Sequence, residues 1–240
     1  MNDQYSIIND QLRRYLMNHF VSTYFCVGLF VLLTNNLFAQ ENVITPDLTK
    51  IISGDGWRII NREPEIVKEN GQKCVHFKVQ NQQGGIAWLE NFEFTNGVIE
   101  VDIKGKNVRG GSFLGIAFRG INDSTYDVVY FRPFNFDSIA NLQGHSVQYI
   151  SHSEYTWFRL RKEHPGQYEN SIIPPPDPDK FFHVKIAINR PKVKVYVNDI
   201  KEPSLVVDEL SDRTGGKIGL WMDFISEGTF ANLKIIPAGD

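Results

Sequence analysis

The side chains of this sequence that could bind a ligand are concentrated between positions 119 and 168. They are aromatic rings, planar polar groups and one histidine, namely Arg119, Tyr130, Arg132, Gln148, His152, Trp157 and Tyr168. Aromatic rings stack on the apolar faces of flat ligands, and guanidinium or amide groups form paired hydrogen bonds with neighbouring polar atoms. This mixture suits a sugar ring. The alternative is that the rings belong to the core and the arginines cover a sheet edge.

A pair of catalytic carboxylates is the first reaction chemistry to test. Retaining glycosidases hold two carboxyl groups about 5 Å apart, and one group of them places its acids along a strand as Glu-x-Asp-x-x-Glu. The nearest match here begins with Glu100 and Asp102 but has Gly105 in the last position. Since Glu100 and Asp102 share one strand face, we favour a solvated surface over a reaction centre. The sequence contains no complete catalytic signature.

Metal-binding residues are equally incomplete. His145, His152 and His164 lie near one another, but their spacing matches no zinc pattern, and exposed loop histidines are the preferred interpretation. The acids near the C-terminal strands are too dispersed to predict a calcium cage; they are Asp199, Asp208 and Asp223. We therefore predict no cofactor, and a structural calcium ion stays an open alternative.

The first 39 residues predict a secretory signal peptide. Arg13 and Arg14 precede an apolar run from about residue 20 to 33, and Ala39 provides a small residue at the cleavage position. Cleavage after Ala39 is the preferred interpretation, with cleavage after Gln40 as the alternative. The mature protein is then expected to be secreted or periplasmic.

A retained membrane anchor is the alternative to cleavage. The apolar run is short for a membrane span and is followed by polar residues, so we expect no stable anchor. Met17 is an alternative start that would remove both arginines. A lipid anchor on Cys26 is disfavoured because the large Tyr24 and Phe25 precede it.

Composition restricts the partners further. The 240-residue chain has a formal net charge of −3, and its basic residues are scattered, which argues against a nucleic-acid partner. After removal of the signal peptide only Cys74 remains, so an internal disulfide is excluded and the core must hold the fold. Cys74 is expected to be a strand residue. The oligomeric state is not predicted.

The stretch 110–136 predicts two long strands joined by a polar turn. Side chains alternate along a strand, so Tyr126, Tyr130 and Arg132 share one face of the second strand and Phe131 lies on the other. Phe131 should then point into the core. Replacing it with alanine should lower stability, whereas Arg132→Ala should spare it.

The rest of the mature chain also predicts short strands. They are expected over residues 51–61, 74–79, 86–94, 98–103, 146–151, 156–161, 182–188, 193–197, 217–222 and 230–236. The proline-rich run 173–178 interrupts them within a long loop, and Trp221 is expected between the sheets. Residues 40–240 thus predict one all-β domain, a sandwich of two antiparallel sheets.

Several segments, taken in their order along the chain, are similar to those of a known superfamily. FTNGVIEVDIKG, GSFLGIAFR, FFHVKIAI with VKVYVND, GGKIGLWMD and FANLKII resemble the concanavalin A-like lectin and glucanase superfamily of jelly rolls. Within it, the chain is most similar to laminin-G-like domains and to bacterial 3-keto-disaccharide hydrolases. The resemblance implies a concave sheet that faces carbohydrate, but no specific reaction. Two functions follow: an exported protein that binds a glycan with the residues named first, or an exported glycoside-cleaving enzyme.

Overall fold

The computed structural model describes residues 13–15, 17 and 42–239 and divides the chain into two units, residues 1–40 and 41–240. In the first unit, residues 13–15 and 17 are helical. The apolar run and the cleavage position of the predicted signal peptide lie outside the described residues. Within the described part of the chain, no helix has the length and apolar character needed to cross a membrane.

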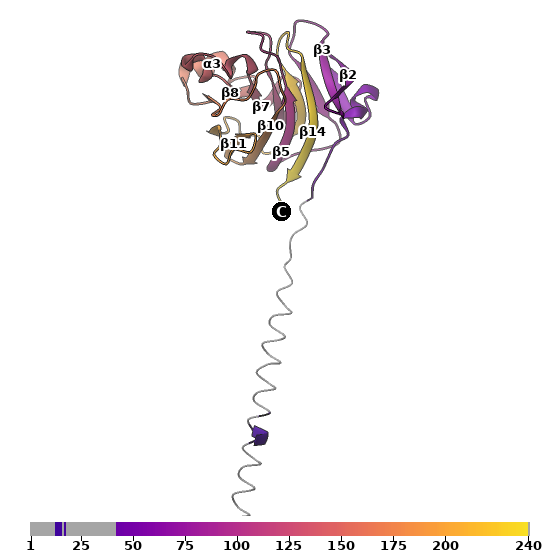
Figure 1. The fold of residues 1–240 in the computed structure, drawn as a ribbon, viewed down its shortest axis with the longest axis vertical. Coiled ribbons are helices and arrows are strands. Elements are labelled where there is room, and N and C mark those ends of the chain that lie inside the picture. Colours follow the sequence, from indigo (N-terminus) through magenta and orange to yellow (C-terminus); the bar gives the residue numbers. More distant parts are fainter. Residues whose placement is uncertain (1–12, 16, 18–41, 240) are drawn as a thin grey trace, which may run out of the picture. The chain divides into compact units, whose positions relative to one another are not determined.

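The second unit contains two seven-stranded antiparallel sheets (Figure 1). The first sheet has the spatial order β1 (Trp57–Ile60), β4 (Gly85–Leu89), β13 (Lys217–Met222), β6 (Leu114–Asn122), β7 (Thr125–Phe131), β8 (Val147–His152) and β9 (Glu169–Asn170). The second sheet has the order β12 (Leu205–Asp208), β11 (Lys192–Val197), β10 (Phe182–Asn189), β5 (Gly97–Lys104), β14 (Gly228–Pro237), β3 (Gln72–Val79) and β2 (Arg62–Glu69). The predicted all-β, two-sheet antiparallel sandwich is confirmed.

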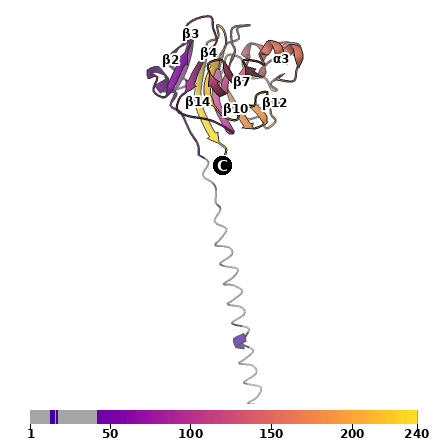
Figure 2. The same cartoon turned by 180° about the vertical axis from the view of Figure 1, so that it is seen from behind.

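Helices are few and short among the described residues. They are the 3-10 helices η1 (Leu48–Ser53) and η2 (Pro133–Asn135) and the α-helices α2 (Ala140–Gln143) and α3 (Trp157–Glu163). Figures 1 and 2 show α3 on one flank of the domain and the β2–β3 hairpin on the opposite flank.

Three predicted strands are wrong in part or in whole. The expected strand over 86–94 ends early, because β4 stops at Leu89. The expected strand over 51–61 begins as η1, and only its second half forms β1. The expected strand over 156–161 is α3, because the Thr156 side chain accepts a hydrogen bond from the backbone N–H of Arg159 (3.4 Å) and so caps a helix. An ion pair from Arg159 to Glu163 (2.8 Å), one helical turn later, adds support.

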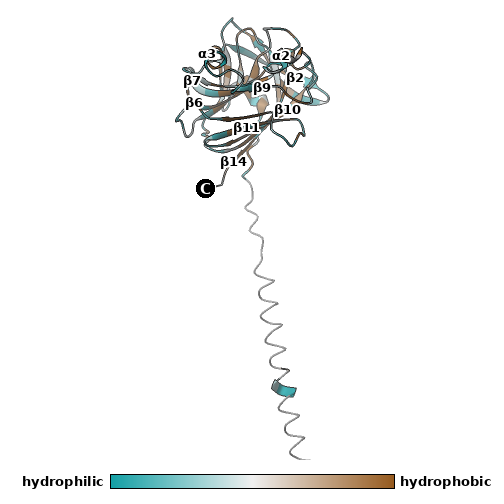
Figure 3. Ribbon diagram, turned by 90° about the vertical axis from the view of Figure 1, so that its left-hand side faces the viewer, coloured by the Kyte–Doolittle hydropathy of each residue, from teal (hydrophilic) through white to brown (hydrophobic). Residues whose placement is uncertain are grey.

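The core lies between the two sheets. Along β10 buried and accessible residues alternate, which is the pattern of a sheet with one covered face. From the first sheet, the Phe131 ring packs edge-on against Phe182 of β10, with 5.2 Å between ring centroids, so the predicted direction of Phe131 is confirmed. Cys74 is buried in β3, also as predicted. Figure 3 shows hydrophobic segments concentrated in the middle of the domain.

The other face of the first sheet is covered as well. The rings of Trp88 and Tyr126 meet edge-on with centroids 5.6 Å apart, and those of Tyr130 and Trp221 pack at a tilt with centroids 5.2 Å apart. All four residues are buried. Trp221 was expected between the sheets but lies on this second face. It is paired with Gly115 of β6, which is paired in turn with Tyr130 of β7, and residues paired across strands share a face. A layer of rings therefore fills most of the face that the sequence predicted to be open.

Candidate functional site

An open pocket remains at one end of the ring layer, with a volume of about 480 Å³. It lies where the loop between β5 and β6 approaches η2, α3 and the turn after β13. Its lining includes three arginines and five aromatic residues: Arg109, Arg132, Arg161, Phe113, Tyr130, Phe134, Trp157 and Phe224, with Phe134 in η2. His145 and Asp223 complete its charged and titratable groups. We call it the arginine pocket.

The floor of the arginine pocket comes from the ends of β7 and β8. Tyr130 donates its hydroxyl hydrogen to Gln148 Oε1 (2.8 Å), and the Arg132 guanidinium contacts both of these oxygens and stacks over the Tyr130 ring at 4.7 Å. Burial raises the pKa of Tyr130 to about 12, so its hydroxyl keeps its proton. These contacts fix the orientation of a guanidinium that is only 5% exposed.

Helix α3 forms one wall. The Arg161 guanidinium lies 5.3 Å from the ring centre of Trp157, one turn earlier in the helix, and Trp157 remains 43% exposed. Arg161 also forms a two-point ion pair with Glu169 of β9, at 2.7 and 3.1 Å. Burial alone would raise the pKa of Glu169, but the hydrogen bonds from Arg161 and the neighbouring positive charges lower it overall. Glu169 is therefore a carboxylate at neutral pH.

The turn after β13 forms the opposite rim. Phe224 adopts a left-handed backbone conformation (φ 48°), which is unfavourable for a bulky residue, and its ring is 51% exposed. The buried Arg62 holds this turn by donating hydrogen bonds to the carbonyl oxygens of Met222 (3.2 Å) and Phe224 (2.7 Å). Asp223 points its Oδ1 to the backbone N–H of Phe224 (2.9 Å). Burial raises the pKa of Asp223 above the ordinary aspartate value.

Three of the seven predicted site residues line this pocket: Tyr130, Arg132 and Trp157. Gln148 lies directly behind them as the hydrogen-bond acceptor of the first two. Arg132 is not the dispensable surface residue expected from the sequence, since it is buried and makes three hydrogen bonds. Arg132→Ala should therefore cost stability.

Arg119 does not belong to the pocket. Its side chain is fully buried and donates to Glu209 (2.8 Å) and to the carbonyl oxygens of Thr95 and Thr214, so it ties β6 to two loops. It was predicted as a site residue from its side-chain type and its place in the central strand pair. A break in the β6–β7 register between Phe118 and Asn122, with Arg119 itself at φ 53°, redirects the side chain.

His152 and Tyr168, the two other predicted site residues, also lie outside the arginine pocket. His152 is partly buried against the Tyr126 ring, with 5.0 Å between centroids, and burial lowers its pKa. Tyr168 packs between Tyr149 and His164, at 6.1 and 5.9 Å. Neither side chain lines the arginine pocket.

Sequence reasoning missed most of the pocket lining, including its charged residues Arg109, Arg161 and Asp223 and the exposed Phe224. Arg161 was missed because residues 156–161 were predicted to form a strand. Thr156, a residue type that often caps a helix, could have corrected that prediction. Arg109 lies in the loop between β5 and β6, and Asp223 comes directly after β13. Binding residues often lie in such loops. The left-handed conformation of Phe224 has no sequence signal.

The incomplete carboxylate motif lies on the outer face of the second sheet. Glu100 pairs with Lys234 (3.2 Å), and Asp102 accepts from Asn232 and contacts His183 Nδ1 (2.7 Å). This agrees with the preferred interpretation of a solvated strand face. Across residues 42–239, the structure shows no group of three or more metal-ligating side chains.

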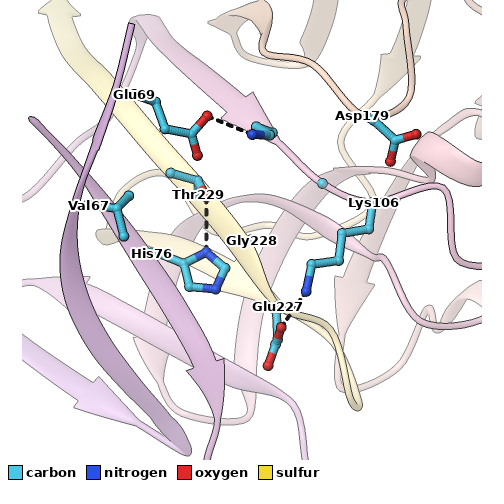
Figure 4. A pocket seen from close by; sticks show the side chains of 10 residues that line it. Val67, Glu69, His76, Lys106, Asp179, Glu227, Gly228 and Thr229 are labelled. Carbon is cyan, nitrogen blue, oxygen red and sulfur yellow. Dashed lines mark hydrogen bonds and ion pairs between the residues drawn. The ribbon is translucent and has the colours of Figure 1, made fainter. Parts of the chain in front are cut away.

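A second pocket, of about 470 Å³, lies beside this outer face (Figure 4). Its cations are matched with carboxylates, since Lys104 pairs with Glu69 and Lys106 with Glu227, each at 2.6 Å. His76 Nδ1 lies 3.0 Å from the Thr229 hydroxyl. No phenylalanine, tyrosine or tryptophan is among the described residues that line it. We call it the paired pocket.

The chain resembles known proteins in fold but not in sequence. No protein-family model matches the chain, and no curated protein matches it in sequence. Among solved structures, the carbohydrate binding module CBM66 from Bacillus subtilis superposes with a TM-score of 0.53 over 75% of this chain and 95% of that chain, at 15% identity. The fold is the concanavalin A-like jelly roll.

Two further structures share this jelly roll. One, described as a native glycosidic hydrolase, has a TM-score of 0.52 and 12% identity over 83% of this chain and 97% of that chain. The other, a Bacillus subtilis protein of unknown function with a galectin-like fold, has a TM-score of 0.50 and 14% identity over 79% and 91%. At these identities the likeness concerns the jelly-roll fold alone.

Proposed function

We propose that the arginine pocket binds a carbohydrate and that the protein is an exported carbohydrate-binding protein. The observation that carries this proposal is the pair of exposed rings, Trp157 and Phe224, on opposite sides of a pocket with a polar, hydrogen-bonding floor. A sugar ring offers apolar C–H faces to such rings and hydroxyl groups to such a floor. Export rests on the predicted signal peptide, and N-terminal sequencing of the native protein would test it.

Two features support a ligand of this kind. The volume of about 480 Å³ lies in the range of small-molecule sites. The left-handed conformation of Phe224 holds an aromatic ring out of the core at a cost of about 1 to 3 kcal/mol, which is more readily understood if the ring contacts a ligand. Two structures with the same fold are described as a carbohydrate binding module and as a glycosidic hydrolase, in agreement with the proposal.

The test uses two neighbouring residues of α3. Trp157 lines the pocket, whereas Phe158, which is 63% exposed, does not. We expect Trp157→Ala to weaken glycan binding roughly two- to tenfold, since an aromatic contact contributes about 0.5 to 1.5 kcal/mol. Phe158→Ala removes only an edge contact with the Trp157 ring (5.7 Å between centroids) and should weaken binding much less. Binding on a glycan array would be measured with matched thermal melts, and equal loss in both variants would contradict the proposal.

The raised pKa of Asp223 favours a second candidate, hydrolysis of a glycosidic bond. Burial raises the pKa of Asp223, and an acid that holds its proton to higher pH can donate it to a leaving oxygen. Release of reducing ends from the glycans that bind would support this candidate, and Asp223→Asn should then abolish release while binding is retained. Binding without any release would leave the protein a non-catalytic binder.

A further inference from the structure

The cations of the arginine pocket are not fully compensated by the protein. Arg132, although buried, hydrogen-bonds only neutral groups: the His145 carbonyl oxygen (2.8 Å), the Tyr130 hydroxyl and Gln148 Oε1. These contacts use three of the five N–H donors of a guanidinium. Its closest carboxylate oxygen, Glu169 Oε2, is 3.8 Å away, beyond hydrogen-bond distance.

Glu169 is already engaged by other groups. Both of its oxygens accept hydrogen bonds from Arg161, and Oε2 lies 2.8 Å from His145 Nδ1 in a geometry that does not form a hydrogen bond. Two guanidiniums thus share one carboxylate. Burial lowers the pKa of Arg132, whereas the hydrogen bond with Glu169 raises that of Arg161. The positive charge that lacks its own counterion is therefore that of Arg132.

The other charged groups of the pocket do not supply the missing negative charge. Arg109 is exposed at the rim and has no ion-pair partner in the part of the chain that the structure describes. Asp223 is the other acid of the pocket, and its charge acts on His152, Arg62 and Arg132 together, so it is not the counterion of Arg132 alone. Arg62 itself forms no ion pair within residues 42–239, since its guanidinium hydrogen-bonds carbonyl oxygens.

Resting on the proposed function, we infer that the preferred ligand is an anionic sugar, whose carboxylate or sulfate group pairs with Arg132 and Arg109. A buried cation such as Arg132 is costly unless an anion accompanies it, and the guanidinium fork of Arg109 can meet a planar carboxylate with two hydrogen bonds. The rings of Trp157 and Phe224 then hold the body of the sugar. The anion completes an arrangement in which the buried Arg132 and the partly exposed Arg161 otherwise share Glu169.

The experiment compares polysaccharides that differ only in charge. The probes are polygalacturonate, alginate and hyaluronate, each beside its carboxyl-reduced neutral form, and dextran sulfate beside dextran. We expect the full-length protein to bind at least one acidic polymer about tenfold or more tightly than its neutral counterpart, and to lose that preference as salt is raised. The carboxylate and sulfate pairs identify the source of the charge.

Two variants from one loop provide the matched control. Arg109 lines the arginine pocket, and Lys106, three residues earlier, lines the paired pocket and pairs with Glu227. Arg109→Gln should reduce affinity for the acidic polymer several-fold with an unchanged melting temperature, and Lys106→Gln should not. Arg132→Gln should abolish the preference for acid if the variant folds. The Arg109 comparison decides the question if Arg132→Gln does not fold.

The outcomes separate the two proposals. Equal binding of acidic and neutral polymers, or equal losses in Arg109→Gln and Lys106→Gln, would overturn the inference of an anionic sugar and leave carbohydrate binding intact. Failure to bind any polysaccharide in the panel or on the glycan array would overturn both.

Discussion

The two pockets receive residues from the same loop, between β5 and β6, yet they treat charge in opposite ways. In the paired pocket each lysine has a carboxylate of its own, at 2.6 Å, and all four side chains keep access to water. In the arginine pocket a buried arginine and a half-exposed one share Glu169, whose side chain is 3% exposed. Because the paired pocket already neutralises its cations, an anion gains little there. Volume does not distinguish the pockets, and charge pairing does.

Removal of the shared carboxylate should give the largest difference between the pockets. Glu169→Gln keeps the shape of the side chain but leaves Arg132 and Arg161 without an anion. We expect a loss of about 3 kcal/mol in the free energy of unfolding, the lower end for a broken buried ion pair because Arg161 is partly solvated. Glu69→Gln, the matched change in the paired pocket, should cost less than about 1 kcal/mol. Urea denaturation would measure both, and similar small losses would refute the contrast.

Removal of one hydroxyl from each pocket should give a smaller difference. Tyr130→Phe deprives Gln148 and Arg132 of a shared partner in a buried site, and we expect a loss of about 1 to 3 kcal/mol. Thr229→Val removes the hydroxyl next to His76, whose ring remains accessible to water, and should cost about 1 kcal/mol or less.

Thermal and urea denaturation of the two hydroxyl variants would be compared under the same conditions. A larger loss for Thr229→Val than for Tyr130→Phe would show that the floor of the arginine pocket is more hydrated than its burial indicates.

Much of the fold could be predicted because strand alternation is a local property. Phe131 and Tyr130 lie on the faces that period-two alternation assigned to them, since β7 is regular. Arg119 shows the limit of this argument. One bulge next to it reverses the relation between sequence position and face, and Gly120 in GIAFRGIN, a residue type that often marks a bulge within a strand, is the sign that was missed.

The site was predicted less completely because it depends on contacts between distant segments. Tyr130, Arg132 and Trp157 were identified from side-chain type, but the partner that matters most, Glu169, comes from a two-residue strand inside the long loop. Which cations share a carboxylate is decided by the packing of α3 and β9 against β8. The same holds for Asp223, whose pKa is raised by burial that the sequence does not reveal.

The smallest effect we predict compares His76, in the paired pocket, with His183 on the same outer face. Burial is the main cause that lowers the pKa of His76, whereas the hydrogen bond with Asp102 is the main cause that raises that of His183, with Glu100 and Asp199 adding to it.

The two shifts have opposite consequences for stability. His76 binds its proton less readily when folded, so its contribution is present above the ordinary histidine pKa of about 6.5 and is lost as pH falls through the folded value. His183 binds its proton more readily when folded, so its contribution is present below about pH 6.5 and is lost as pH rises through the folded value. Each effect should be below about 1 kcal/mol because both rings are partly solvated.

Urea denaturation between pH 5.5 and 8.5 would separate the two histidines. His76→Gln should flatten the decline in stability on the acid side, and His183→Gln should flatten the decline on the alkaline side. If His76→Gln instead flattened the alkaline side, its ring would be protonated in the folded protein, and the paired pocket would hold a cation that its carboxylates do not balance. The contrast between the two pockets would then rest on burial alone, because both would contain positive charge available to an anion.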